Sequence, residues 1–386
     1  MARTSFSISW FTRGSGFASP GLRAAGQVVR YHPASGGLVV EFLFVPYQAH
    51  GHVAPMLAVA SRLAARGVRV RMVAGRQFAA SVCSAGVVPV DVHSAFEVRV
   101  PAGWGCRDVA ERHRLWLSRR RLASDMAAVC HGEIARMGAG VVVVDPHMAW
   151  TRNLRLPERV RMAWVCTTSG RRIPRGASSV LVNGVAELLG DAVVGDRVRF
   201  IGPLLGALSV PDPGIPWDRV RGTRVLVAAA GTVFTQSVEQ LRSLVAAFAD
   251  SEWTVVLATG RIPAAALGRL PNNVLAYSWI PQAEVLGHAD MFLTHGGMNS
   301  VLEAMACGVP MVVHPRIAEQ RRSAVRLEKL GVAKVVSFRA GLRERIEQVA
   351  DDRQIRMSVS RLRQKILEAP TADRAADELL ALAWVV

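Results

Sequence analysis

Short apolar segments, each followed by turn and helix sequence, recur along the chain and constrain its fold more than any other feature. Leu38–Val45 predicts a buried parallel strand, Pro55–Arg66 a helix with proline in its first turn, and Val68–Val73 the next strand. A strand, a helix and a strand in this order form a parallel βαβ unit. The same pattern predicts further strands at Gly140–Val144, Ala163–Thr167, Val225–Val227, Trp253–Leu257, Val274–Tyr277, Met291–Thr294 and Met311–His314. The sequence therefore predicts an α/β protein built from doubly wound parallel sheets.

The length of 386 residues, with 51% hydrophobic content, predicts two domains. A Pro- and Gly-rich stretch marks a linker at 204–217, between an N-terminal domain at 38–203 and a C-terminal domain at 218–370. A final helix is expected at 371–386. Residues 1–37 contain no acidic residue and no apolar core long enough for a secretory signal, so we expect a disordered extension rather than a targeting segment.

The formal net charge of +17 raises the hypothesis of nucleic-acid binding. Only Lys329, Lys334 and Lys365 are lysines, and the arginines are dispersed along the chain, so we expect no nucleic-acid partner. The five cysteines are scattered and form no C-x-x-C pair, which is typical of reduced thiols in the cytoplasm. No apolar run reaches the roughly 20 residues of a membrane helix.

The most informative stretch for function runs from Trp279 to Gln320. Its apolar Met291–Leu293 leads into a glycine-rich turn and then helix-like sequence, so that backbone N–H groups at a helix start can face a phosphate. Glu303 follows one turn into this helix, on the same face as Asn299 and Ser300. A base to stack, a ribose diol, a diphosphate and a hexose are the parts of a nucleotide-sugar that such groups match.

This order of residues resembles the donor-binding signature of the family-one UDP-glycosyltransferase-like enzymes, which share the GT-B fold. The pattern W-x-P-Q, H-x-G-x-N-S, E and acidic-Gln is matched at Trp279, Pro281, Gln282, His295, Gly297, Asn299, Ser300, Glu303, Glu319 and Gln320. The Glu-Gln ending resembles the bacterial macrolide glycosyltransferase subgroup. The resemblance covers roughly residues 38 to 370 and implies two Rossmann-like domains facing a cleft, the N-terminal one for the acceptor and the C-terminal one for the nucleotide-sugar.

The resemblance also implies a role for each donor-side residue. Trp279 would stack on uracil or thymine, with Gln282 nearby. Glu303 would accept both ribose hydroxyls. Glu319 and Gln320 would orient the hexose. The diphosphate would be held by His295, Gly296, Gly297, Asn299, Ser300 and, from a second loop, Thr232.

A catalytic base is expected after the first strand, where open α/β sheets bind their ligands. The family pattern G-H-V-x-P falls on His52, so the resemblance assigns the general base to it, with His50 as the fallback. Asp145, at the end of a strand, would orient the imidazole. The alternatives are that the histidine caps the helix and that Asp145 caps the turn before Pro146. A zinc pair of His50 and His52 lacks further ligands.

The sequence departs from the family pattern at two places. Ala229 stands where relatives commonly have serine, and only Ser169–Asp196 fills a region where relatives have several dozen residues walling the acceptor pocket. We therefore expect an N-terminal domain with a shortened acceptor region, which a partner protein could reshape.

The resulting prediction is an inverting glycosyltransferase. It would move a hexose from a UDP- or dTDP-sugar, as co-substrate, to a hydroxyl of a hydrophobic, macrolide- or polyketide-like small molecule. No D-x-D triplet occurs, so neither metal nor cofactor is expected. The alternative is a non-catalytic relative that binds a nucleotide-sugar or stabilises a partner enzyme.

Overall fold

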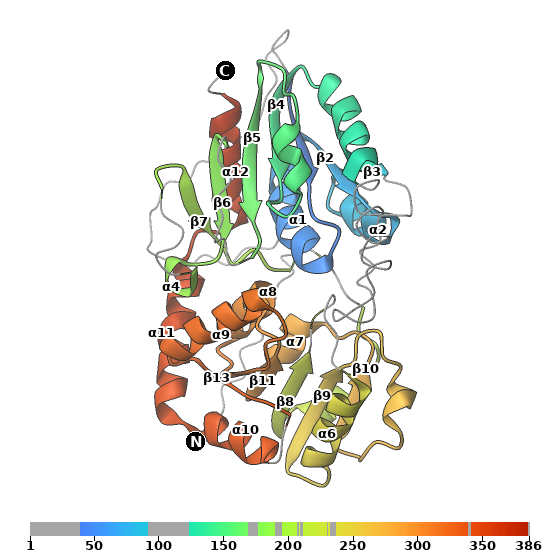
Figure 1. Ribbon diagram of the computed structural model, residues 1–386, viewed down its shortest axis with the longest axis vertical. Coiled ribbons are helices and arrows are strands. Elements are labelled where there is room, and N and C mark those ends of the chain that lie inside the picture. Colours follow the sequence, from blue (N-terminus) through green and yellow to red (C-terminus); the bar gives the residue numbers. More distant parts are fainter. Residues whose placement is uncertain are drawn as a thin grey trace, which may run out of the picture.

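The protein consists of two parallel α/β units, one above the other in Figure 1. The computed structural model describes residues 39–91, 123–168, 177–189, 195–206, 208, 211–229, 231, 237–338 and 341–384. The predicted fold class, two doubly wound parallel sheets, is confirmed. Within the described ranges, no helix has the length and apolarity that crossing a bilayer requires.

The first sheet has seven parallel strands in the order β3-β2-β1-β4-β5-β6-β7. Its two central strands, β1 and β4, are buried at every position, which explains why VEFLFV and AGVVVV show apolar runs instead of alternation. The strands are β1 (Val40–Val45), β2 (Arg69–Ala74), β3 (Val88–Asp91), β4 (Ala139–Val144), β5 (Val160–Cys166), β6 (Ser179–Asn183) and β7 (Val198–Ile201).

The second sheet has six parallel strands in the order β10-β9-β8-β11-β12-β13. Chain order reverses direction between β8 and β11, and this reversal is the point where open α/β sheets bind ligands beyond the strand ends. The strands are β8 (Arg224–Ala229), β9 (Trp253–Ala258), β10 (Val274–Tyr277), β11 (Met291–Thr294), β12 (Met311–Val313) and β13 (Ala333–Val335).

Helices cover both sheets, as Figure 1 shows. Residues 123–135 are also helical. The α-helices with full bounds are α1 (His50–Ala65), α2 (Arg76–Ser84), α4 (Ala186–Leu189), α5 (Trp217–Val220), α6 (Val238–Phe248), α7 (Gln282–Leu286), α8 (Met298–Cys307), α9 (Ala318–Lys329), α10 (Leu342–Asp351), α11 (Arg353–Glu368) and α12 (Ala372–Ala383). Short 3-10 helices lie at Ala149–Asn153 and Ala264–Leu267.

The last helix, α12, packs on the first sheet although the chain has already built the second (Figure 1). Ala375, Ala376 and Leu379 are fully buried in the core cluster that contains the β1 phenylalanines. The small alanine side chains allow α12 to approach α1 closely. An ion pair between Arg66 and Asp377, 2.6 Å long, joins the two helices at the surface.

Two local predictions need correction. Helix α1 begins at His50 and not at Pro55, so the predicted loop histidines lie in its first turns. The expectation failed because proline is most common at the first helical position, whereas here it lies inside the helix. The short region before β7 also contains a strand that we did not predict, β6, which pairs with both β5 and β7. Residues 169–176 and 190–194 of that region lie outside the described residues.

Candidate active site

Three neighbouring strands bring the polar residues of the first domain together. β4 lies between β1 and β5, and all three are parallel, so their carboxyl ends meet at one edge of the sheet. His52 follows β1 on α1, Asp145 follows β4 directly, and Thr167 follows β5 directly. The sheet therefore converts three positions that are far apart in the sequence into one cluster.

His52 and Asp145, the two predicted catalytic residues, are in direct contact. The Nδ1 atom of His52 lies 2.7 Å from Oδ2 of Asp145, and Asp145 is completely buried whereas the His52 side chain is 14% exposed. The Thr167 hydroxyl donates to the same carboxylate oxygen at 3.1 Å and lies 2.8 Å from His52 Nδ1. With Nδ1 held by the carboxylate, Nε2 is the ring nitrogen left to accept a proton.

Asp145 remains ionised despite its burial. Burial alone would raise its pKa, but the charge of His52 and hydrogen bonds from His147 and His52 hold the pKa well below its usual range. A permanently ionised carboxylate stabilises an imidazolium and fixes the ring orientation, as in triad chemistry.

Sequence reasoning missed His147 and the role of Thr167. The backbone N–H of His147 donates to Asp145 Oδ1 at 2.8 Å, and its Nδ1 lies 3.1 Å from the same oxygen. The His147 pKa is raised, chiefly by the side-chain hydrogen bond to Asp145, while burial opposes the shift. His147 lies two residues after Asp145, and Thr167 directly follows β5, the strand next to β4. These positions at strand ends beside Asp145 are the signal in the sequence that could have identified both residues.

The same cluster could hold a metal ion by distance alone. His52, Asp145 and His147 offer one ligand atom each, all within 4.8 Å of one another. However, both Asp145 oxygens already accept hydrogen bonds from the two histidines and from Thr167. The contacts therefore favour an acid–base cluster over a metal centre.

The second domain offers an anion site at the start of α8. Gly296 adopts φ +83°, and the next residue, Gly297, is the N-cap, so the first amides of this ten-residue helix have no side-chain cap. The His295 ring occupies the space over Gly231 and Gly297, where added Cβ atoms would come within 2.6 and 2.3 Å of it. This packing explains why both flanking positions are glycine.

His295 is a neutral residue in this setting. Burial lowers its pKa to about 4, against a weaker opposing effect of the Ala229 carbonyl. Its Nδ1 atom is buried with no hydrogen-bond partner among the described residues. A buried ring nitrogen with no partner, beside helix-start amides that have no side-chain cap, fits a phosphate oxygen, to which neutral His295 would donate in the tautomer that carries its proton on Nδ1.

Glu303 lies one turn into α8 and is half-buried. Its carboxylate accepts from Nε2 of Gln282, which also donates to Ser300 Oγ at 3.2 Å. Burial raises the Glu303 pKa to about 7, and the Gln282 hydrogen bond only partly offsets this. Trp279, at the start of the same segment, is 47% exposed, so part of its ring is open to solvent.

Asn299 bonds to the first domain. Its Nδ2 donates to the carbonyl of Gly51, and its Oδ1 accepts from Asn183 Nδ2 at 3.1 Å. The Gly51 carbonyl is available because Pro55, four residues later, has no N–H to complete the helical bond. The predicted diphosphate contact of Asn299 would therefore compete with this interdomain contact.

The remaining predicted residues have different surroundings. Gln320 is buried, and its Oε1 accepts from the backbone N–H of Arg316 at 2.8 Å, so it caps the start of α9. Glu319 is half-buried and close enough to act electrostatically on His147. His50, the fallback base, lies 6.2 Å from Trp279 between ring centroids, and its buried Nε2 has no partner within the described chain. Thr232 lies outside the described residues.

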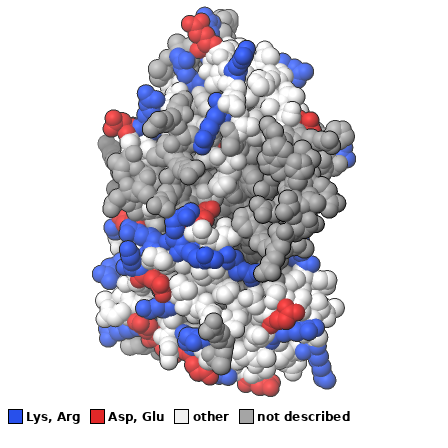
Figure 2. Space-filling view, in the orientation of Figure 1, with Lys and Arg blue, Asp and Glu red and all other residues white. Residues whose placement is uncertain are grey.

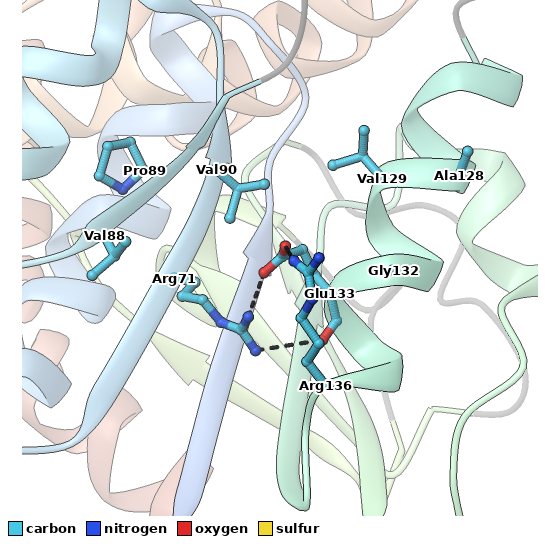
Figure 3. Close-up of a pocket in the computed structure, with 9 residues that line it drawn as sticks. All are labelled: Arg71, Val88, Pro89, Val90, Ala128, Val129, Gly132, Glu133 and Arg136. Carbon is cyan, nitrogen blue, oxygen red and sulfur yellow. Dashed lines mark hydrogen bonds and ion pairs between the residues drawn. The ribbon is translucent and has the colours of Figure 1, made fainter.

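A cavity of about 500 Å³ lies elsewhere, between β2, β3 and helix 123–135 (Figure 3). Arg71 on its wall pairs with Glu41 and Glu133, and Glu133 also pairs with Arg136. Its lining includes Val88, the first residue of β3, and Arg71 in the middle of β2. Its charges neutralise one another, and it lies away from the His52 cluster.

Two facing doubly wound domains, with an acid–base cluster on one and an uncapped helix start on the other, define a GT-B protein. Comparison with known proteins supports this class. Residues 198–372 match the family model of UDP-glucuronosyl and UDP-glucosyl transferases. The crystal structure of CalG4, the calicheamicin glycosyltransferase, superposes with a TM-score of 0.70 at 29% identity, covering 89% of this chain and 98% of that one.

Curated relatives give the same result. The oleandomycin glycosyltransferase of Streptomyces antibioticus is 28% identical over 380 residues, 85% of this chain and 87% of the relative. The NDP-glycosyltransferase YjiC of Bacillus licheniformis is 33% identical over 191 residues, and the match spans 48% of each chain. The resemblance is thus confirmed: residues 198–372 match the family model of the UDP-glucuronosyl and UDP-glucosyl transferases, and most of the chain is similar to an antibiotic glycosyltransferase of Streptomyces.

Proposed function

We propose that the protein is an inverting glycosyltransferase. It moves a hexose from a UDP- or dTDP-sugar to a hydroxyl of a hydrophobic, macrolide- or polyketide-like small molecule. The observation that carries the proposal is the His52–Asp145 contact of 2.7 Å, at the sheet edge that faces the uncapped start of α8. The relatives' names, which include an oleandomycin glycosyltransferase, support the substrate class.

In this mechanism, His52 Nε2 removes the proton from the acceptor hydroxyl as its oxygen attacks the anomeric carbon of the sugar. The bond from that carbon to the nucleoside diphosphate breaks on the opposite side, so one displacement inverts the configuration. Asp145 stabilises the imidazolium that forms.

The leaving diphosphate gains charge as it departs. The first amides of α8 and the neutral His295 are oriented to stabilise it, which is a preorganised electrostatic contribution. No metal is required in this proposal. Figure 2 shows Lys and Arg side chains in a band across the middle of the molecule, over the region of α4 and α9 in Figure 1, and this positive charge favours the approach of an anionic donor.

The proposal is tested by incubating the purified protein with UDP-glucose or a dTDP-hexose and a panel of macrolide and aromatic alcohols. Mass spectrometry should detect a hexosylated product, and NMR should show inversion at the anomeric carbon. The matched control is His52→Ala, which should bind UDP normally and form product at least about a hundredfold more slowly. UDP binding without product from any acceptor would instead support a non-catalytic nucleotide-sugar-binding protein.

A further inference from the structure

One buried carboxylate serves two histidines in this site. Asp145 Oδ2 bonds to His52, and Asp145 Oδ1 receives both the backbone N–H and Nδ1 of His147. The two imidazole rings lie edge to face with centroids 4.8 Å apart. If Asp145 served only to orient His52, the hydrogen bonds from His147 would not be needed.

We propose, on the basis of the proposed glycosyl transfer, that His147 is a positioning residue that sets the proton affinity of His52 through Asp145. His147 does not replace His52 as the base. His147 forms hydrogen bonds to the carboxylate that also contacts His52. It also places a second ring that can carry a charge beside the His52 ring.

The sign of this effect follows from the contacts. Hydrogen bonds from His147 to Oδ1 withdraw negative charge from the carboxylate that stabilises protonated His52. A proton on His147 also repels a proton on His52, since two like charges at this distance interact strongly when partly buried. Both effects of His147 oppose the addition of a proton to His52.

The same residue connects the cluster to the second domain. The chargeable groups that face His147 are Asp145 at the end of β4, His52 on α1, Tyr47 before α1 at 5.8 Å between ring centroids, and Glu319 on α9. Glu319 is one of the two residues expected to bind the hexose. Its negative charge favours the protonated form of His147, so occupation of the sugar site would alter the charge that His52 experiences.

Histidine NMR titration tests this inference without any turnover. Protein labelled with ¹³C-histidine is titrated as wild type, His147→Phe and, as matched control, His131→Gln, an exposed histidine of helix 123–135. The His52 midpoint should rise in His147→Phe by about half a pH unit or more, a threefold change in proton affinity. The control should leave it unchanged.

A second variant covers the case in which His147→Phe does not fold. His147→Asn keeps a polar side chain at this position but removes the chargeable ring, so the His52 midpoint should again rise. A His52 midpoint equal to that of wild type in whichever of the two His147 variants folds would overturn the inference. Neither result depends on an acceptor, so the proposed function is judged separately by product formation.

Discussion

Glu303 gives the sharpest test of the donor site, because its burial has a thermodynamic consequence. The substitution Glu303→Gln keeps the size and shape of the side chain and removes the ionisable group. Burial raises the Glu303 pKa from an ordinary value of 4.5 to about 7. We predict that the variant is more stable than wild type at alkaline pH and equally stable in acid.

The sign follows from proton linkage. Below pH 4.5 the carboxyl is protonated in both the folded and the unfolded chain, and the substitution changes nothing. Between pH 4.5 and 7 the unfolded chain ionises first, so wild type loses stability as pH rises. Above pH 7 the loss is complete, and 2.5 pH units at about 1.4 kcal/mol each set its upper limit between about 3 and 4 kcal/mol.

Urea unfolding of the C-terminal domain at pH 8 and at pH 4.5 measures this difference. Glu344→Gln, an exposed glutamate on α10, is the matched control and should show little change at either pH. The same Glu303→Gln protein should bind UDP more weakly, because an amide cannot accept from both ribose hydroxyls. If the difference in unfolding midpoint between the variant and wild type is the same at both pH values, Glu303 is not an acid whose pKa is raised by burial.

Three further predictions concern other residues. His52→Ala should lower turnover by about two to four orders of magnitude, measured by product mass spectrometry, and activity within a few-fold of wild type would contradict the general-base role. Trp279→Ala should weaken UDP binding by about threefold to tenfold in calorimetry, through loss of ring stacking, and unchanged affinity would exclude the platform role. Asn299→Ala removes the bonds to Gly51 and Asn183, so it should loosen the domain interface, and a radius of gyration from solution scattering that stays at the wild-type value would contradict this.

Much of the fold could be predicted because parallel sheets bury both faces. The apolar runs of β1, β4 and β8 carry this signal directly, and each predicted strand matches an observed strand to within a few residues. β6 was missed because Ser179–Asn183 is short and has polar residues at both ends. The start of α1 was missed because the proline rule describes the first helical position only.

The candidate site was predictable where one residue type at one strand end carries the chemistry. His52 and Asp145 met this condition, and the sheet brings them into contact. His147 and Thr167 did not meet this condition, because their roles depend on which carboxylate oxygen of Asp145 each residue contacts in the folded protein. Gln320 has the expected place in the chain, but its carbonyl caps α9, a use that only backbone geometry reveals.

The return of α12 to the first sheet matters for anyone who recombines halves of such proteins. The last helix is physically part of the first domain, since its apolar face completes that core. A hybrid with a single junction in the linker would combine the native first sheet with the α12 of another protein. The apolar face of that helix would not match the core on which it has to pack. Exchange of the C-terminal domain therefore calls for two junctions, the second between α11 and α12, so that α12 stays with the first sheet on which it packs.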